Sequence, residues 1–199
     1  MSLTWALDLY FDRRGSVNTQ GRLSTVLVFL LATLAAPNAN STIYYSKKEA
    51  LELAFGKEAL IETRSFFLTD AQIAEIEKIA RIKLDSKLYT FYVGKRQDVL
   101  VGYAAIESHT VRTKPETLMI VLTPVGQLDR IYLLAFHEPP EYRPPERWFA
   151  QLYSRPLVDL ELNRGVDGIS GATLSSRSAL GSARKVLALY QVLIAQKGQ

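Results

Sequence analysis

Apolar residues at helical spacing predict three helices. Two of them start with a capping box, in which a serine or threonine precedes an apolar run and Glu or Gln follows three residues later. The pairs are Ser46 with Glu49 and Thr69 with Gln72. Gly56 is expected to stop the first helix. The second is expected to place four apolar residues near one face: Ile73, Ile76, Ala80 and Leu84. A longer stripe over about residues 176–196 predicts a C-terminal helix.

The middle of the chain has the pattern of strands. Apolar runs at 88–93 and 99–106 flank one turn-forming segment, and runs at 118–122 and 131–136 flank a second. Consecutive hairpins of this kind predict an antiparallel meander. Together with the helices, they indicate an α+β fold in which helices pack on an antiparallel sheet and one helix ends the domain.

A further apolar run changes the interpretation of the first 41 residues. Residues 23–36 are uncharged, several arginines precede them, and the polar segment 37–41 follows. A basic lead, an apolar run of about 14 residues and an exit of small residues are typical of a secretory signal peptide. A membrane span needs about 20 residues. We therefore expect residues 1–41 to be a signal peptide and 42–199 to be one domain, with an uncleaved membrane anchor as the alternative.

The composition excludes several kinds of chemistry. There is no cysteine, so disulfides, iron–sulfur clusters, thiolate metal sites and thiol catalysis are ruled out. The two histidines, His109 and His137, are far apart in sequence, and we expect no metal site. The formal charge of +4 is spread along the chain, which favours solubility and not a nucleic-acid partner. No acid–base pair or nucleophilic triad is apparent, so we predict no catalytic residues.

The segment 167–176, DGISGATLSS, carries the clearest candidate chemistry. It combines small residues and hydroxyl groups just before the C-terminal helix. Bare backbone N–H groups and the helix dipole favour an anion at such a place. Thr173 is expected to present its hydroxyl there. The simpler alternative is a helix start without a ligand, because clusters of Ser, Thr and Gly are common at helix ends.

This segment resembles the flavinylation motif of the FMN-binding domain family, Asp-x-x-Ser/Thr-Gly-Ala-Thr-x-Ser/Thr. Members of that family include subunits of the Rnf and Nqr respiratory complexes. The matching residues are Asp167, Ser170, Gly171, Ala172, Thr173 and Ser175. The resemblance implies that Thr173 carries FMN as a covalent phosphoester. It also implies a maturation partner, an exported, magnesium-dependent flavin transferase that uses FAD as donor.

The likeness extends less specifically over about residues 44–195. Residues 99–126 resemble the strands that precede the flavin site in the family. Residues 138–142, together with Arg147 and Trp148, resemble a Glu-Pro-x-Glu-Tyr…Arg-Trp pattern of stand-alone exported members. By this resemblance Glu138, Tyr142 and Trp148 are candidates to border the flavin ring, although core packing is the favoured role for Trp148.

The resemblance implies a set of cofactor-binding residues around Thr173. Asp167 is expected to help the transferase engage, and Ser170 and Ser175 to bond the phosphate or cap the helix. His109, Arg112 and Lys114 are candidates to face the phosphate or the flavin ring, with an exposed basic loop as the alternative. The remaining members of the set are Gly168, Ile169, Gly171, Ala172, Leu174 and Ser176.

The function implied is that of an exported electron-transfer protein, periplasmic or anchored in the membrane and facing the periplasm. Its expected partners are the flavin transferase and a membrane quinol-linked or multihaem redox protein. Membrane association is expected only if the N-terminal segment is uncleaved. One alternative is an adaptor subunit that binds a phosphorylated ligand non-covalently at the same helix start. A weaker one is a flavin-dependent reductase acting on an extracellular acceptor.

Overall fold

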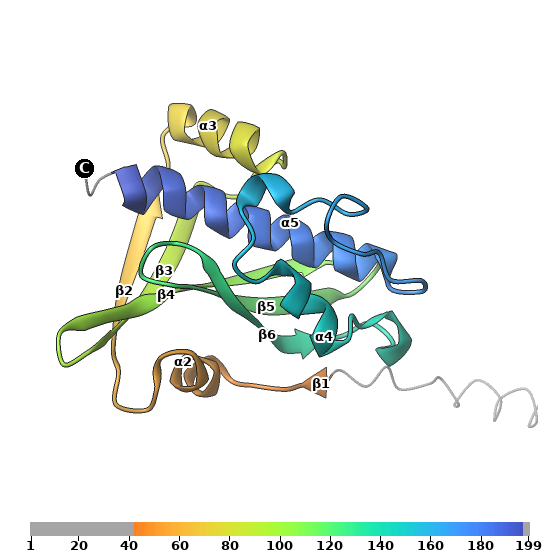
Figure 1. Ribbon diagram of the computed structural model, residues 1–199, viewed down its shortest axis with the longest axis horizontal. Helices are drawn as coiled ribbons and strands as arrows, with labels where there is room; N and C mark the ends of the chain where they lie inside the picture. The colour runs from red at the N-terminus through yellow and green to blue at the C-terminus, as the bar shows by residue number, and fades with distance from the viewer. Residues whose placement is uncertain (1–41, 197–199) are drawn as a thin grey trace, which may run out of the picture. The chain divides into compact units, whose positions relative to one another are not determined.

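The computed structural model describes residues 42–196, which form an antiparallel sheet with helices on both faces (Figure 1). The strand order is β1-β6-β5-β4-β3-β2. Strands β2 to β6 form a meander, and the short β1 pairs with β6 at one edge of the sheet. The strands are β1 (Thr42–Ile43), β2 (Leu60–Phe67), β3 (Leu88–Arg96), β4 (Val99–Thr110), β5 (Pro115–Leu122) and β6 (Leu128–Phe136). The predicted α+β class and the antiparallel meander are thereby confirmed. The signal-peptide prediction for residues 1–41 lies outside the described residues.

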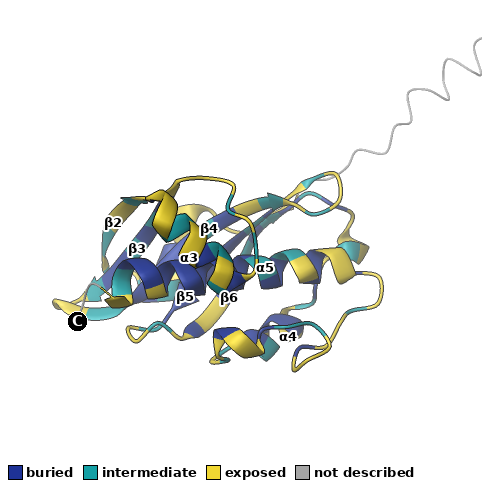
Figure 2. Cartoon of the chain, turned by 90° about the horizontal axis from the view of Figure 1, so that it is seen from above, coloured by how far each residue is buried: buried dark blue, intermediate teal, exposed yellow. Residues whose placement is uncertain are grey.

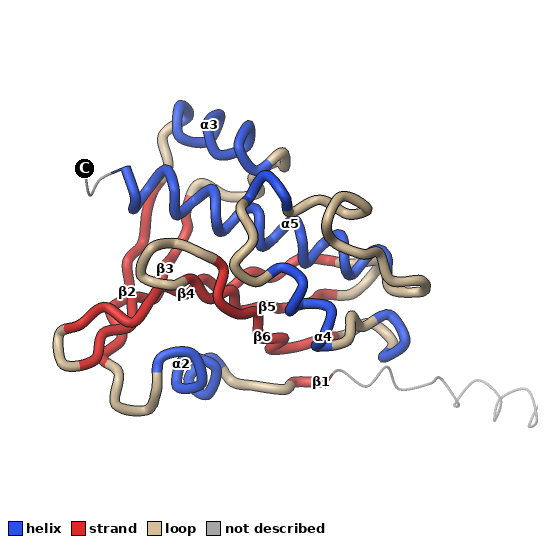
Figure 3. Tube along the Cα trace, in the orientation of Figure 1, coloured by secondary structure: helices blue, strands red, loops and turns tan. Residues whose placement is uncertain are grey.

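The helices lie on the two sides of this sheet (Figures 1 and 3). They are α2 (Lys47–Phe55), α3 (Asp70–Ala80), the short α4 (Glu146–Phe149) and α5 (Thr173–Tyr190), which continues as a π-helical turn, Gln191–Ala195. Both predicted capping boxes are present, at Ser46 and Thr69. Gly56, with φ of 91°, follows the last residue of α2, as expected of a helix-stopping glycine. Within residues 42–196, no helix has the length and apolar character needed to cross a bilayer.

Two sequence expectations about helix ends were wrong. The second helix ends at Ala80 because Arg81 adopts a left-handed conformation, so Leu84 lies beyond the helix, although it still packs against the core. The C-terminal helix begins at Thr173, three residues before the expected start at 176. Thr173 is therefore the first residue of the helix itself.

The core has two parts, one on each face of the sheet. Strand β5 shows this by alternation: Leu118, Ile120 and Leu122 face the larger cluster, whereas Met119 and Val121 face the smaller one. Helices α3 and α5 cover the first face and α2 covers the second (Figure 1). Figure 2 shows that α5 is buried over much of its length, and the two residues that begin it, Thr173 and Leu174, are exposed. The sheet and its neighbours thus fix the helix and leave its N-terminus accessible.

Candidate functional site

Thr173 lies at the accessible N-terminus of α5. Its side chain is exposed, and its hydroxyl donates a hydrogen bond to the carbonyl of Ile169 at 3.0 Å. The N-cap residue is Ala172, which provides no side-chain cap, so neither Ser170 nor Ser175 caps the helix. The first N–H groups of a helix have no acceptor within it. The start of α5 therefore presents a threonine hydroxyl together with uncapped backbone donors.

Gly171 gives the chain its approach to this helix. Its φ is 86°, in the left-handed region that glycine tolerates best. A Cβ atom built on Gly171 would meet no atom within 4 Å, so the space beside the backbone is open. Conformation, and not crowding, is therefore the reason for a glycine at this position.

A shallow hollow of about 170 Å³ lies against the first turn of α5. Its lining consists of Arg112, Tyr142 and the residues 171–175. The guanidinium of Arg112 lies over the ring of Tyr142, 4.6 Å from its centroid. A cation from the β4–β5 loop is thus brought to the start of the helix. The guanidinium, the helix dipole and the free N–H groups all favour an anion, and a phosphate group suits them well.

Ser175 adds a polar group that has no partner in the protein. It is 1% exposed and lines the hollow, and its Oγ makes no hydrogen bond within residues 42–196. An unsatisfied buried polar group costs about 1–3 kcal/mol. The neighbouring Ser176 differs, because its hydroxyl donates to the carbonyl of Ala172 at 2.9 Å. A buried hydroxyl without a partner, such as that of Ser175, is expected where a polar ligand would supply the missing hydrogen bond.

Two hydrogen bonds to its backbone hold Asp167, the acid of the motif, in place. Its carbonyl accepts a hydrogen bond from Trp148 Nε1 at 2.7 Å, and its N–H donates to Gln151 Oε1 at 3.0 Å. Trp148 is 2% exposed, so its indole both packs in the core and anchors the motif. The Asp167 residue itself is exposed. Its expected part in engaging a transferase stays a prediction.

The loop that carries Arg112 is held by Glu138. One carboxylate oxygen of Glu138 accepts hydrogen bonds from the backbone N–H groups of Arg112, Thr113 and Lys114, at 3.0, 2.6 and 2.8 Å. Burial raises the pKa of Glu138, but the three N–H donors outweigh it and the pKa lies below its ordinary value. Glu138 therefore positions the loop, whereas Tyr142, which follows in the 3₁₀ turn Pro140–Tyr142, reaches the hollow itself.

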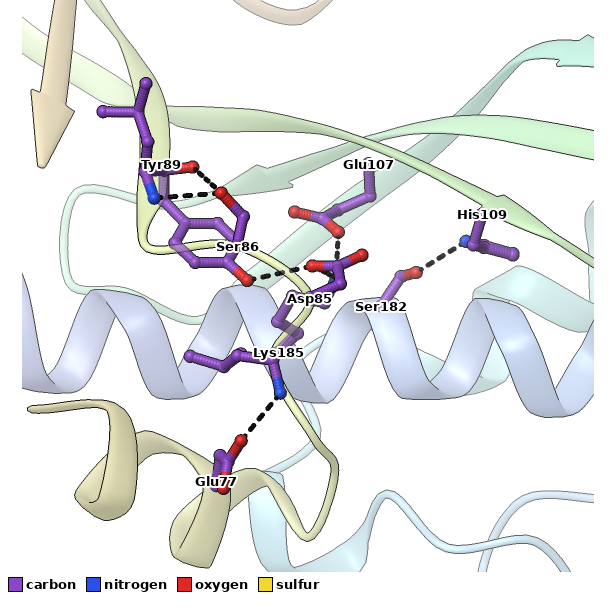
Figure 4. Close-up of polar contacts among 10 residues, drawn as sticks. Glu77, Asp85, Ser86, Tyr89, Glu107, His109, Ser182 and Lys185 are labelled. Atoms are coloured by element: carbon purple, nitrogen blue, oxygen red, sulfur yellow. Dashed lines mark hydrogen bonds and ion pairs between the residues drawn. The ribbon is translucent and has the colours of Figure 1, made fainter. Parts of the chain in front are cut away.

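His109 lies away from the hollow, in contrast to Arg112. Its Nε2 is 2.9 Å from Glu116 Oε2. Its Nδ1 is 3.1 Å from the hydroxyl of Ser182 (Figure 4). Ser182 follows Thr173 by nine residues, which is about 13 Å along a helix axis. The structure thus brings Arg112 to Thr173 and pairs His109 with a buried carboxylate that the sequence analysis had not singled out.

The other residues of the motif divide by exposure. Gly168 and Ser170 are exposed, Ile169 packs against the core, and Leu174 is 45% exposed on the lining of the hollow. Lys114 contributes its backbone N–H to Glu138. The structure therefore collects residues 171–175, Arg112 and Tyr142 around one hollow, and places the earlier part of the motif on the approach to it.

No protein-family model matches this chain, and a search of curated proteins gives no match. The features of this chain that point to a function are therefore the motif at 167–175 and the geometry of the hollow.

Proposed function

We propose that this protein is an exported electron carrier that holds FMN through a phosphoester on Thr173. One observation carries the proposal: the threonine of a complete flavinylation motif is the exposed first residue of α5 and shares a hollow with Arg112. A threonine that only started a helix would require neither a nearby cation nor an orphaned buried hydroxyl beside it.

The residues around the hollow fit the phosphate of FMN. The first N–H groups of α5 and the Arg112 guanidinium would hold its oxygens, and the Ser175 hydroxyl would gain the partner it lacks. Sites that enclose a drug-sized ligand usually measure about 300–1,000 Å³. A hollow of about 170 Å³ therefore suits the phosphate end, with the flat ring outside it near Tyr142 and Leu174.

Attachment would use the Thr173 hydroxyl as the nucleophile. Its Oγ1 bonds to the FMN phosphorus of FAD, the P–O–P bond breaks, AMP leaves, and the hydroxyl proton passes to a base of the transferase. The hydrogen bond from Thr173 to the Ile169 carbonyl is lost in this step, at a cost of about 1 kcal/mol. The exposure of Thr173 gives a transferase access.

Attached FMN would supply reversible electron uptake, and the protein would supply attachment, orientation and charge. A ring outside the hollow would be open to a redox partner, for which we propose a quinol-linked membrane protein or a multihaem protein. We place the carrier outside the cytoplasm because of the basic and apolar pattern before residue 41. A permanent ester is useful there, since a dissociated cofactor would be lost.

The proposal is tested by coexpressing the full chain with an FMN transferase and measuring intact mass. We expect one FMN adduct on the wild-type chain and on Thr173→Ser, which keeps a hydroxyl, and none on Thr173→Ala. Thr63→Ala, a change at an exposed threonine on the edge strand β2, is the matched control and should retain the adduct. An adduct that persists in Thr173→Ala would contradict the proposal.

A second function is favoured by one observation. The Thr173 hydroxyl donates inward to the Ile169 carbonyl, which leaves the first N–H groups of the helix free for a ligand held without a covalent bond. The protein would then be an adaptor for a phosphorylated molecule. Denaturation followed by washing separates the two functions, because yellow colour that washes away would identify the adaptor.

A further inference from the structure

A row of polar side chains crosses the interface between α5 and the sheet. We call it the polar seam. It consists of Ser175, Ser182 and Lys185 on α5, Glu107 and His109 on β4, and Glu116 on β5. Except for His109, all of these residues are less than 9% exposed. Buried charged groups are costly unless they are paired, so a row of them within a core requires an explanation.

At one end of the polar seam, Lys185 bridges two carboxylates. Its Nζ lies 2.6 Å from Glu107 Oε2 and 3.6 Å from Asp85 Oδ1, and the Tyr89 hydroxyl donates to Asp85 at 3.1 Å (Figure 4). Burial raises the pKa of Glu107, and Lys185 opposes that rise. This end is satisfied by its own partners.

In the middle, Ser182, His109 and Glu116 form a chain of hydrogen bonds. The order of groups resembles a nucleophile, a base and an acid. Ser182 is only 4% exposed, however, and lies in the interior of α5, so no substrate reaches its hydroxyl. These three hydrogen-bonded residues therefore offer no accessible nucleophile, and a hydrolytic role for them is excluded.

The other end of the polar seam is not satisfied. Within residues 42–196, two buried side-chain atoms have no hydrogen-bond partner, and these are Glu116 Oε1 and Ser175 Oγ. Ser175 lines the hollow beside Thr173. Glu116 is the second residue of β5, directly after the loop that brings Arg112 to the same hollow. Ser175 thus borders the proposed phosphate site, whereas Glu116 Oε1 belongs to the carboxylate that pairs with His109.

The Glu116–His109 pair is placed to respond to charge. Burial raises the pKa of Glu116, and the hydrogen bond and charge of His109 lower it. Glu107, two residues before His109 on β4, is affected by the charge of His109 and is paired with Lys185 on α5. On β6, the register neighbour of Glu116 is the apolar Phe136.

We propose that the Glu116–His109 pair is a proton acceptor for the hollow, so that negative charge arriving at Thr173 is compensated by a proton taken up by the pair. This inference rests on the proposed function in taking the hollow as an anion site. His109 contacts Ser182, which lies about 13 Å along α5 from Thr173, and unit charges that far apart at an effective dielectric constant near 20 interact by about 1 kcal/mol. Solvent at the exposed Thr173 reduces the effect, so we expect a modest coupling.

The test places a charge at residue 173 without any cofactor. Thr173→Glu adds a carboxylate at the first position of α5, and Thr173→Gln is its neutral match. The chain has two histidines, so each imidazole is readily followed by NMR during a pH titration. We expect the pair to take up its proton at a pH higher by roughly 0.3–0.7 in the Glu variant than in the Gln variant.

Equal titration of the pair in the two variants would overturn the proposal. Adding Glu116→Gln to each variant is the second test, because the amide keeps an acceptor for His109 but cannot hold the proton. The difference between the Glu and Gln variants should then fall at least twofold, and a difference that persists in full would also contradict the pair as acceptor. Neither of these titrations uses flavin, so the two proposals fail separately. An FMN adduct on Thr173 without the change in titration refutes the coupling alone. The change in titration without an FMN adduct refutes the attachment alone.

Discussion

Thr173 and Ser175 are two residues apart, yet their hydroxyl groups meet opposite environments. Thr173 is exposed and donates to Ile169, whereas Ser175 is buried and unpartnered. Successive helical residues turn by about 100°, so residues two apart point to nearly opposite sides. The exposed Thr173 hydroxyl and the buried Ser175 hydroxyl therefore come from one turn of helix at the edge of one hollow.

Replacing Ser175 by alanine separates stability from ligand binding. Because the hydroxyl has no partner, its removal should leave the free energy of unfolding unchanged or raise it by up to about 1 kcal/mol. The fraction of chain that acquires FMN should fall. Urea unfolding and intact mass measure the two effects. Ser176→Ala, which loses a bond to the backbone but no group in the hollow, should lower stability and leave attachment intact. A clear loss of stability in Ser175→Ala would contradict this account.

At the scale of single residues, the sequence predicted the position of Thr173 but not the environment of each candidate partner. Arg112 and His109 are three residues apart, and nothing local distinguishes them. Their separation depends on Glu116 and Ser182, which bind His109 from β5 and α5, and on the loop that turns Arg112 toward the hollow. Charged residues among the apolar positions of a strand were the available signal, since Glu107 and His109 continue the buried face of Tyr103 and Ala105.

At the scale of elements, the hollow depends on the β4–β5 loop as much as on α5. Glu138 holds that loop through three backbone N–H groups. The loop then places Arg112 over Tyr142, on the lining of the hollow. Glu138, which is far from Thr173 in sequence, thus sets the position of the Arg112 guanidinium beside Thr173.

Glu138→Gln should loosen this loop. A neutral amide accepts more weakly than a carboxylate, so we expect a loss of about 1–3 kcal/mol in stability and faster amide exchange at residues 112–114. In the wild-type chain, the lowered pKa of Glu138 means that its contribution is present above about pH 4.3, the ordinary value, and is lost as pH falls through the lowered value. Hydrogen exchange followed against pH measures this. Equal exchange in both proteins would show that Glu138 does not hold the loop.

The elements themselves were largely predictable because their signals are local. Capping boxes and alternating runs lie within a few residues of the structure they specify, and the helices at Ser46 and Thr69 start as predicted. The start of α5 was set too late. Its first turn is rich in serine, and the apolar stripe used to find the helix begins only at Leu180.

At the scale of the whole molecule, α5 is joined to the sheet by charge as well as by apolar packing. Lys185 and Glu107 are 78 residues apart in sequence, yet Lys185 Nζ lies 2.6 Å from Glu107 Oε2 in the interface. A buried pair of this kind adds little net stability, but removing one partner leaves a charge without compensation. The alternation along β4 marks Glu107 as facing the core, but nothing local in the sequence identifies Lys185 as its partner.

Lys185→Met should therefore destabilise the protein by about 3–5 kcal/mol at neutral pH. Burial already raises the pKa of Glu107, and the loss of Lys185 should raise it further. A raised folded-state pKa makes the ionised form costly, so the variant should lose stability as pH rises through that pKa and recover it as pH falls. Lys87→Met, which removes a partner of the exposed Asp70, is the control and should change stability far less. Denaturant unfolding at several pH values measures both, and equal losses would contradict the buried pair.

The most direct test of the central claim is fragmentation of the peptide that carries the motif, from protein made together with a flavin transferase. Cleavage after Arg164 and Arg177 releases residues 165–177. This peptide contains one threonine, Thr173, and three serines. We predict that the FMN phosphate is found on Thr173 after denaturation and digestion. A peptide recovered without FMN, or with it on one of the serines, would contradict the account.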